Sequence, residues 1–123
     1  MGQSTDAIIC YGIKLGEEDE IPKWVWDFAG LEDKRDTGDD DGEVLYSLYM
    51  ALESKGLTLV THCSDVCTMY VLAAKGSQIT AWRGETKKMD LTKLLGKEKT
   101  YQKAFSKLGR ATKPSWILCS WWG

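Results

Sequence analysis

The sequence predicts a single α+β domain in which a mostly antiparallel sheet of about five strands packs with two helices. The chain has 123 residues, the usual size of one domain, and its hydrophobic fraction of 43% is enough for one core. Apolar residues alternate in some segments, as strands require, and recur every three or four positions in others, as helices require. We therefore treat residues 1–123 as one domain.

The first strand is predicted over residues 6–15, where apolar side chains occupy both faces of an alternating pattern. Residues 17–43 then differ in character, because they hold twelve acidic and three basic residues, a net charge of −9. We expect this segment to be an acidic insert with loop character. Within it, Trp24, Trp26 and Phe28 alternate, which predicts a short extended piece that anchors the loop.

The next element is predicted to be a helix over residues 43–55. Asp40 and Glu43 have the spacing of a capping box at its start, and Gly56 is suited to its end. The prediction depends on five apolar residues that recur at helical spacing, which are Val44, Leu45, Leu48, Tyr49 and Leu52.

Three strands are predicted to follow, over residues 57–64, 68–75 and 78–83. Gly76–Ser77 separates the last two, and a two-residue loop that begins with glycine is typical of a type II′ hairpin. The sequence therefore predicts an antiparallel meander over residues 57–83.

A basic stretch comes next, with ten basic and three acidic residues between positions 82 and 113, a net charge of +7. Residues 91–95 predict one helical turn closed by Gly96, and residues 101–108 predict a helix with an apolar stripe. The last strand is predicted over residues 115–122 and is expected either to pair with the first or to flank the meander. We interpret the lysines as a solvated helix face and expect no direct nucleic-acid binding, because no aromatic residues interrupt this face and the acidic insert would repel phosphate.

Several reaction classes are excluded by missing motifs. The isolated glycines fit neither a dinucleotide-binding nor a Walker pattern. His62 is the only histidine, which excludes sites that need two or three imidazoles. Residues 39–42 resemble part of a calcium loop, but position 48, where a bidentate Glu is required, is leucine. We therefore predict no catalytic residue, no metal and no cofactor.

Four cysteines are spread over the chain, and we expect them to be reduced structural residues. The alternative is a thiol- or zinc-dependent enzyme built on His62, Cys63 and Cys67, which bring three soft ligands within six positions. Cys10 or Cys119 would supply its fourth ligand.

Six tryptophans are the least ordinary feature of the composition. We expect those in predicted strands to build the core, and the alternative is a stacking platform for a nucleotide or another small molecule beside Arg83 or Arg110. These strand residues are Trp82, Trp116, Trp121 and Trp122.

A partner-binding surface is predicted in the acidic insert, because Trp is enriched at interfaces and clustered acids speed association with a basic surface. The competing interpretation is that the acids fold over the basic stretch and neutralise it. The residues predicted to bind a partner are Glu17, Glu18, Asp19, Glu20, Trp24, Trp26, Asp39, Asp40 and Asp41.

Five short segments carry a resemblance, which are Ser4–Gly12, His62–Ser64, Met69–Ala73, Ala81–Gly84 and Trp121–Gly123. Together they resemble a family of small accessory proteins of tailed bacteriophages for which no activity is established. The resemblance implies expression in the cytoplasm of a bacterial host, which agrees with the lack of a predicted membrane span or export signal. It also implies a non-enzymatic protein that binds and inhibits a host protein, such as a nucleic-acid-binding defence complex in the manner of an anti-CRISPR.

Overall fold

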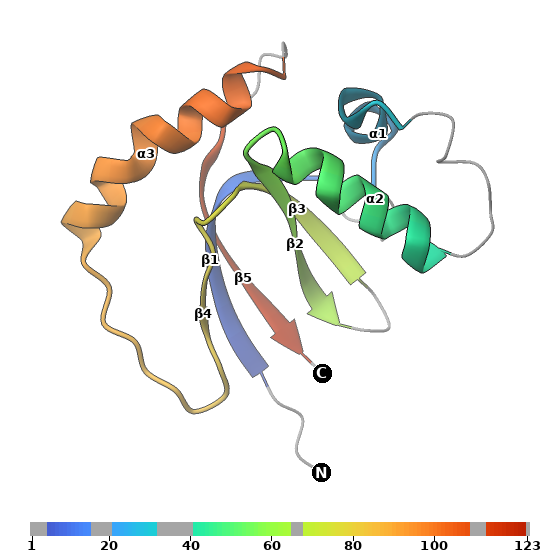
Figure 1. Ribbon diagram of the computed structural model, residues 1–123. Helices are drawn as coiled ribbons and strands as arrows, with labels where there is room; N and C mark the ends of the chain where they lie inside the picture. The colour runs from blue at the N-terminus through green and yellow to red at the C-terminus, as the bar shows by residue number, and fades with distance from the viewer. Residues whose placement is uncertain (1–4, 16–20, 32–40, 65–67, 109–112, 123) are drawn as a thin grey trace.

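The computed structural model describes residues 5–15, 21–31, 41–64, 68–108 and 113–122. The predicted α+β class is confirmed, with one mostly antiparallel five-stranded sheet and three helices instead of two (Figure 1). In chain order the elements are β1 (Thr5–Lys14), α1 (Lys23–Ala29), α2 (Asp41–Glu53), β2 (Leu57–Ser64), β3 (Thr68–Ala74), β4 (Ile79–Ala81), α3 (Leu91–Ser106) and β5 (Ser115–Trp122).

The first and last strands pair with each other, and the sheet then closes into a ring. β1 pairs antiparallel with β5 over eight residue pairs, from Thr5 with Trp122 to Gly12 with Ser115. On its other side β1 pairs with β3 and β4. β2 pairs antiparallel with β3 and, over its last two residues, parallel with β5. The pairings β1–β5–β2–β3–β1 form a closed ring, so the sheet has an inner and an outer face.

The inner face holds a small core made by strands alone. Ile8, Cys10, Val60, Val71 and Ala73 are buried together, and they come from β1, β2 and β3. Three residues of β5 pack against them, which are Ile117, Cys119 and Trp121. Because side chains alternate along a strand, the intervening residues of β1 and β5 point outward.

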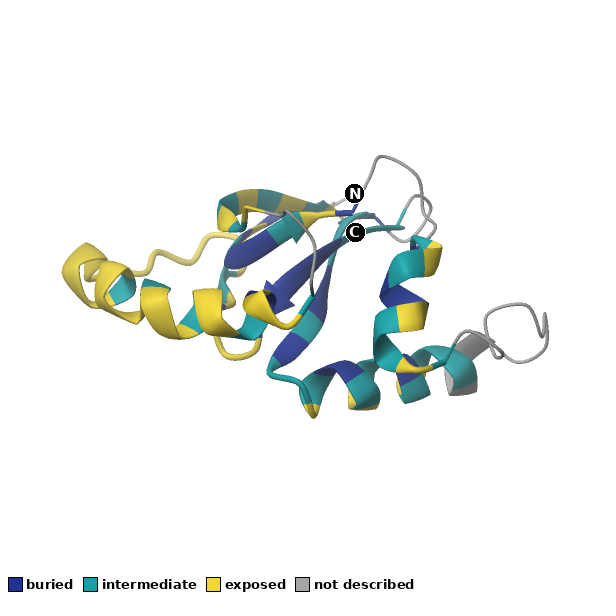
Figure 2. Ribbon diagram, turned by 90° about the horizontal axis from the view of Figure 1, so that it is seen from above, coloured by how far each residue is buried: buried dark blue, intermediate teal, exposed yellow. Residues whose placement is uncertain are grey.

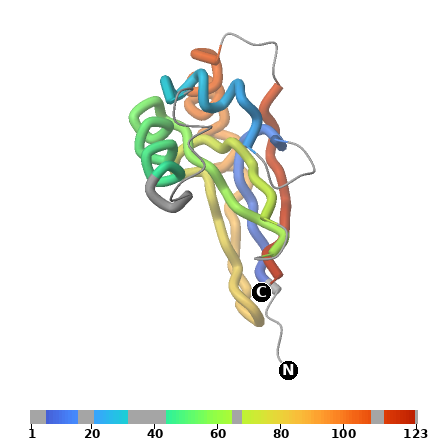
Figure 3. Tube along the Cα trace, turned by 90° about the vertical axis from the view of Figure 1, so that its right-hand side faces the viewer, coloured from blue at the N-terminus to red at the C-terminus, as the bar shows by residue number. Residues whose placement is uncertain are grey.

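The outer face carries the larger core, which the three helices cover. Leu48 and Leu52 of α2, Val25 of α1 and Phe105 of α3 are buried in one cluster with Tyr11 of β1. Four aromatic rings join α3 to the sheet, with centroids 5.2 to 6.2 Å apart. They belong to Tyr11, Tyr101, Phe105 and Trp116. The helices gather at one end of the strands, and the other end extends beyond them (Figure 3).

The predicted hairpin at Gly76–Ser77 is wrong, although the β2–β3 hairpin is confirmed. β3 and β4 both run antiparallel to β1, with Gly12 opposite Ala73 and Ile9 opposite Ile79. The chain from 73 to 79 is three residues longer than its partner segment from 9 to 12, so β3 and β4 form one strand interrupted by a bulge. Propensity alone did not reveal this, because turn and bulge use the same residues.

Two helix predictions also need correction. Residues 23–29 form a helix, not an extended piece, which begins after Pro22 and ends at Gly30 with φ 77°. In so short a segment, alternation and helical spacing cannot be told apart. α3 runs through Gly96 without interruption, starting where the Asp90 side chain accepts a hydrogen bond from the Lys93 N–H at 3.2 Å.

Candidate functional site

Most of the acidic residues predicted to bind a partner lie outside the described residues. Asp41 opens α2, and only its backbone is described. The acidic surface therefore stays a prediction. The acids outside the described ranges are Glu17, Glu18, Asp19, Glu20, Asp39 and Asp40.

The two tryptophans predicted as interface anchors lie in α1. Trp26 is 8% exposed and belongs to the outer core, and the half-buried Trp24 packs against the same cluster. Trp26 therefore stabilises the fold in this structure and is not a projecting anchor. The spacing of Trp24, Val25, Phe28 and Ala29 is compatible with a helix, but over seven residues it does not exclude the alternation of a strand.

The proposed zinc or thiol site gains no support from the described residues. Cys67 lies outside them, and they hold no group of three metal-binding side chains. His62 lies in β2, where its Nε2 is buried and has no hydrogen-bond partner within the described part of the chain. Burial and, to a smaller extent, the charge of Lys14 lower the pKa of His62, so the neutral form is favoured.

Cys10 and Cys119 form a thiol pair on the inner face. The hydrogen bond with Cys119 and burial raise the pKa of Cys10, which is fully buried. The same hydrogen bond lowers the pKa of Cys119. Cys10 is thus a protonated core residue, as expected for a structural cysteine.

Of the four tryptophans that were predicted to lie in strands and build the core, two are not core residues. Trp116 and Trp121 pack against the outer and inner cores, but Trp82 is 61% and Trp122 is 51% exposed. Leu118, in the same strand as Trp116, is 71% exposed. An even number of positions separates Trp116, Leu118 and Trp122, so their side chains lie on the same, outer face of β5. This face is covered by α3 near Trp116 and is exposed to solvent at Leu118 and Trp122.

The first half of α3 also exposes apolar side chains. Leu91 is 63% and Leu95 is 61% exposed, whereas Tyr101 and Phe105 in the second half pack on the sheet. The helix extends away from the strands, and most of it is exposed (Figure 2). We call Leu91, Leu95, Leu118 and Trp122 the outer apolar residues.

The lysines of α3 surround this projecting helix with positive charge. All of them are exposed, and none forms an ion pair with a described residue. In the basic stretch, the ion pair within the described ranges joins Lys87 and Glu85 at 3.8 Å. The described acids therefore do not neutralise α3, whose lysines are Lys93, Lys97, Lys99 and Lys103.

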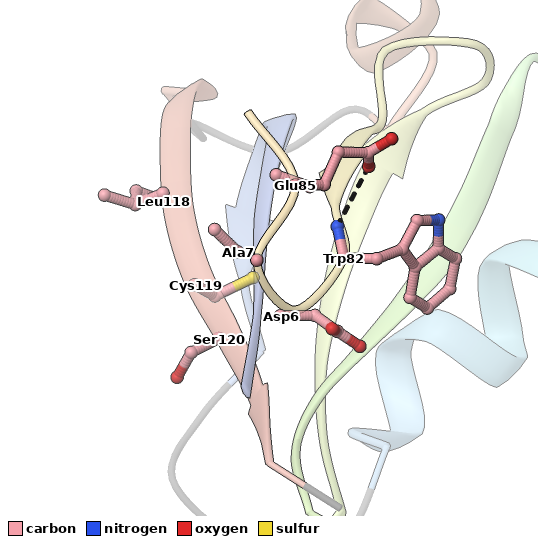
Figure 4. A pocket seen from close by; sticks show the side chains of 9 residues that line it. Asp6, Ala7, Trp82, Glu85, Leu118, Cys119 and Ser120 are labelled. Carbon is pink, nitrogen blue, oxygen red and sulfur yellow. Dashed lines mark hydrogen bonds between the residues drawn. The ribbon is translucent and has the colours of Figure 1, made fainter. Parts of the chain in front are cut away.

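A hollow of about 480 Å³, which we call the outer hollow, lies beside the bare end of β5. The turn after β4 forms one wall, where Glu85 accepts a hydrogen bond from the Trp82 N–H at 3.1 Å (Figure 4). The opposite wall comes from β1 and β5. The lining residues are Asp6, Ala7, Ala81, Trp82, Gly84, Glu85, Leu118, Cys119 and Ser120.

A second hollow of about 190 Å³, which we call the tryptophan hollow, shares Asp6 and Trp82 with the first. Asp6 is only 5% exposed, and its Oδ1 accepts a hydrogen bond from the Arg83 N–H at 2.9 Å. The carboxylate of Asp6 and the indole of Trp82 lie on the same side of the turn (Figure 4). The lining residues are Asp6, Ile8, Thr61, Gln78, Thr80, Trp82 and Trp121.

The charge of these hollows determines which ligands they favour. The outer hollow is lined by Asp6 and Glu85 and the tryptophan hollow by Asp6, and within the described part of the chain no lysine or arginine lines either. An anionic ligand would meet carboxylates without a compensating cation. The hollows therefore do not favour the stacking of a nucleotide phosphate beside tryptophan and arginine that the sequence suggested as an alternative.

Comparison with known proteins identifies no relative: no family model, no curated protein and no solved structure matches the chain. Nowhere in the described residues does a helix combine the length and the apolar composition needed to cross a membrane.

Proposed function

We propose that the chain is a non-enzymatic binding protein that docks on a partner protein through its outer apolar residues. The observation that carries this proposal is the exposure of Leu118, which is 71% exposed on a face that α3 covers only two residues away. The phage resemblance supplies the setting. In this setting the partner is a bacterial host protein in the cytoplasm. Docking of the chain inhibits that host protein, which is an anti-defence role of the anti-CRISPR type.

Apolar side chains that are exposed together in a folded domain mark binding surfaces, whereas single ones are ordinary. In this chain two pairs are exposed, Leu91 and Leu95 on the first half of α3 and Leu118 and Trp122 on β5. When a partner binds, the apolar surface of Trp122 and the three leucines would be removed from water, which favours association. Burying such side chains drives docking, because each contributes about 1.5–3 kcal/mol when fully buried.

The lysines of α3 specify the partner's charge. They are exposed beside Leu91 and Leu95 and have no acidic partner among the described residues. A complementary surface would present carboxylates around an apolar groove, and long-range attraction would speed the encounter. We therefore assign to this face a partner with an acidic rim.

The acidic insert is a separate part of the proposal, because its charge suits a basic partner surface instead. Replacing Glu17, Glu18, Asp19 and Glu20 by serine, and Asp39, Asp40 and Asp41 in a second variant, tests it. Slower association with weaker salt dependence is expected from either variant. Unchanged association in both would remove the acidic surface from the account.

The main test compares two double variants in capture from bacterial lysate. Leu91→Ser with Leu95→Ser removes the exposed leucines of α3, and exposed positions tolerate this with a change in stability within about 0.5 kcal/mol. Tyr46→Ser with Met50→Ser is the matched control, because both residues are about half exposed on α2. We expect the wild type and the control to capture the same stoichiometric protein and the α3 variant to lose it. Equal capture by both variants would contradict the proposal.

A further inference from the structure

The geometry points to the tryptophan hollow as a binding site for a monovalent organic cation, an alkylammonium or a guanidinium group. This site is independent of the docking surface proposed above, because its lining shares no residue with the four outer apolar residues. The inference combines a buried carboxylate, two indoles and the small size of the hollow.

The first observation is the burial of the Asp6 carboxylate. A carboxylate that is 5% exposed is costly to keep ionised unless hydrogen bonds or a counter-charge compensate it. Asp6 accepts one hydrogen bond, from the Arg83 backbone N–H, and forms no ion pair with a described residue. The cationic side chain of Arg83 is exposed and does not line the hollow. A positive ligand in the hollow would compensate the charge of Asp6.

The second observation is the pair of indoles that line the hollow with Asp6. Trp82 follows β4, and Trp121 lies in β5, directly opposite Asp6 in the β1–β5 register. The face of an indole attracts a cation, and Trp is the strongest of the aromatic side chains in this respect. Carboxylate and tryptophan together are the chemistry used to bind quaternary and alkylated ammonium groups.

The third observation is the size and polarity of the hollow. Its volume of about 190 Å³ is below the usual range for drug-sized ligands, so it suits a single cationic head group. Thr61 and Gln78 supply a hydroxyl and an amide oxygen that accept hydrogen bonds from N–H donors, and the Thr80 hydroxyl oxygen already accepts one from Gln78 Nε2 at 3.0 Å. A guanidinium or primary ammonium would use these acceptors, and a methylated ammonium would use the indoles.

Two sources supply such a group, a free small cation or the Lys or Arg side chain of another protein. The experiment separates them with two pairs of probes, followed by the indole N–H signals in NMR spectra of the full chain. Choline is paired with its uncharged isostere 3,3-dimethylbutan-1-ol. The peptides acetyl-Gly-Lys-Gly-amide and acetyl-Gly-Arg-Gly-amide are paired with acetyl-Gly-Gln-Gly-amide.

We expect the cationic probe of at least one pair to shift the signals of Trp82 and Trp121 saturably, and its neutral counterpart to bind at least tenfold more weakly. Choline binding would identify a free cation as a sufficient ligand, and binding of the Lys or Arg peptide alone would identify a protein side chain. Equal binding of charged and neutral probes, or no shift with any cationic probe, would overturn the inference.

Three variants assign the effect to the hollow. Asp6→Asn keeps the Oδ1 acceptor for the Arg83 N–H but removes the charge, and should weaken binding at least tenfold. Trp82→Ala is at an exposed position, so the fold should tolerate it, and it should weaken binding roughly 2- to 30-fold. Tyr46→Ala is the control at an exposed aromatic residue of α2 outside the hollow, and it should bind as the wild type does. If Trp82→Ala binds the cation unchanged, the site is not this hollow, whether or not Asp6→Asn folds.

Discussion

Ser77 occupies the bulge between β3 and β4, and replacing it by alanine tests the description of this bulge. Its side chain is 2% exposed, and its Oγ accepts a hydrogen bond from the Tyr11 N–H at 3.0 Å. The same Oγ donates to the Ala74 carbonyl oxygen at 2.7 Å. The hydroxyl therefore replaces the strand partner that the bulge takes away from β1.

The loss of stability expected for Ser77→Ala depends on which hydrogen-bonding groups lose their partner. The Ala74 carbonyl still accepts from the Ser77 N–H at 3.1 Å, so it remains satisfied. The Tyr11 N–H loses its partner inside the fold, where water does not replace it. A buried donor without a partner costs about 1–3 kcal/mol. We expect the free energy of unfolding to fall by this amount.

The assay is urea denaturation followed by circular dichroism, with Ser54→Ala as the matched control. Ser54 Oγ also donates to the carbonyl three residues earlier at 2.7 Å, but it is exposed and accepts no N–H from a described residue. Its replacement should change the free energy of unfolding by no more than about 0.5 kcal/mol. If Ser77→Ala is as mild as Ser54→Ala, the hydroxyl does not hold the bulge and the reasoning is refuted.

Three further predictions concern packing, pH and thiol reactivity. Gly12→Ala would place its Cβ against a carbonyl oxygen of β3 and should lower the free energy of unfolding by about 3 kcal/mol or more. Gly96→Ala adds a Cβ to α3 where no other atom lies close, and it should raise the free energy of unfolding by about 0.5–1 kcal/mol. Thermal melts in which both variants shift the melting temperature in the same direction would contradict this. Because the pKa of His62 is lowered in the fold, its contribution to stability is complete above the unfolded pKa of 6.5 and is lost as the pH falls from there toward the folded pKa. Wild-type stability should therefore fall more than that of His62→Gln between pH 7.5 and 5.5, and denaturation curves that shift equally would refute it. Iodoacetamide with peptide mapping should label Cys119 well before Cys10, and equal rates would show that burial and the shared hydrogen bond do not control these thiols.

Local sequence patterns predicted the elements whose contacts are near in sequence. The apolar spacing of residues 43–55 predicted α2, alternation predicted β1, and the apolar segment after Pro114 predicted β5. The β3–β4 interruption was not predictable in this way, because it depends on the pairing of both segments with β1, whose partner residues lie 57 to 74 positions away in the sequence. α1 was misread because seven residues are too few to separate a period of 2 from one of 3.6.

The candidate site was less predictable than the fold. Strand propensity placed Trp82 and Trp122 in the core, but burial depends on whether a helix covers that end of the sheet, and α3 does not. In the sequence, Asp6 is only the first residue of the first predicted strand. Only the register that sets it opposite Trp121, and the turn that brings Arg83 to its Oδ1, make it a buried carboxylate in a hollow.

The central claim is that the outer apolar residues contact a partner protein. Site-specific photo-crosslinking tests it directly, with benzoylphenylalanine placed at position 118 in one variant, at 95 in a second and at 46 on α2 in a third, each expressed in bacterial cells. The account predicts that one partner crosslinks at positions 118 and 95 and that position 46 gives no such product. Crosslinks to a common partner at position 46 alone, or to none at any position, would contradict it.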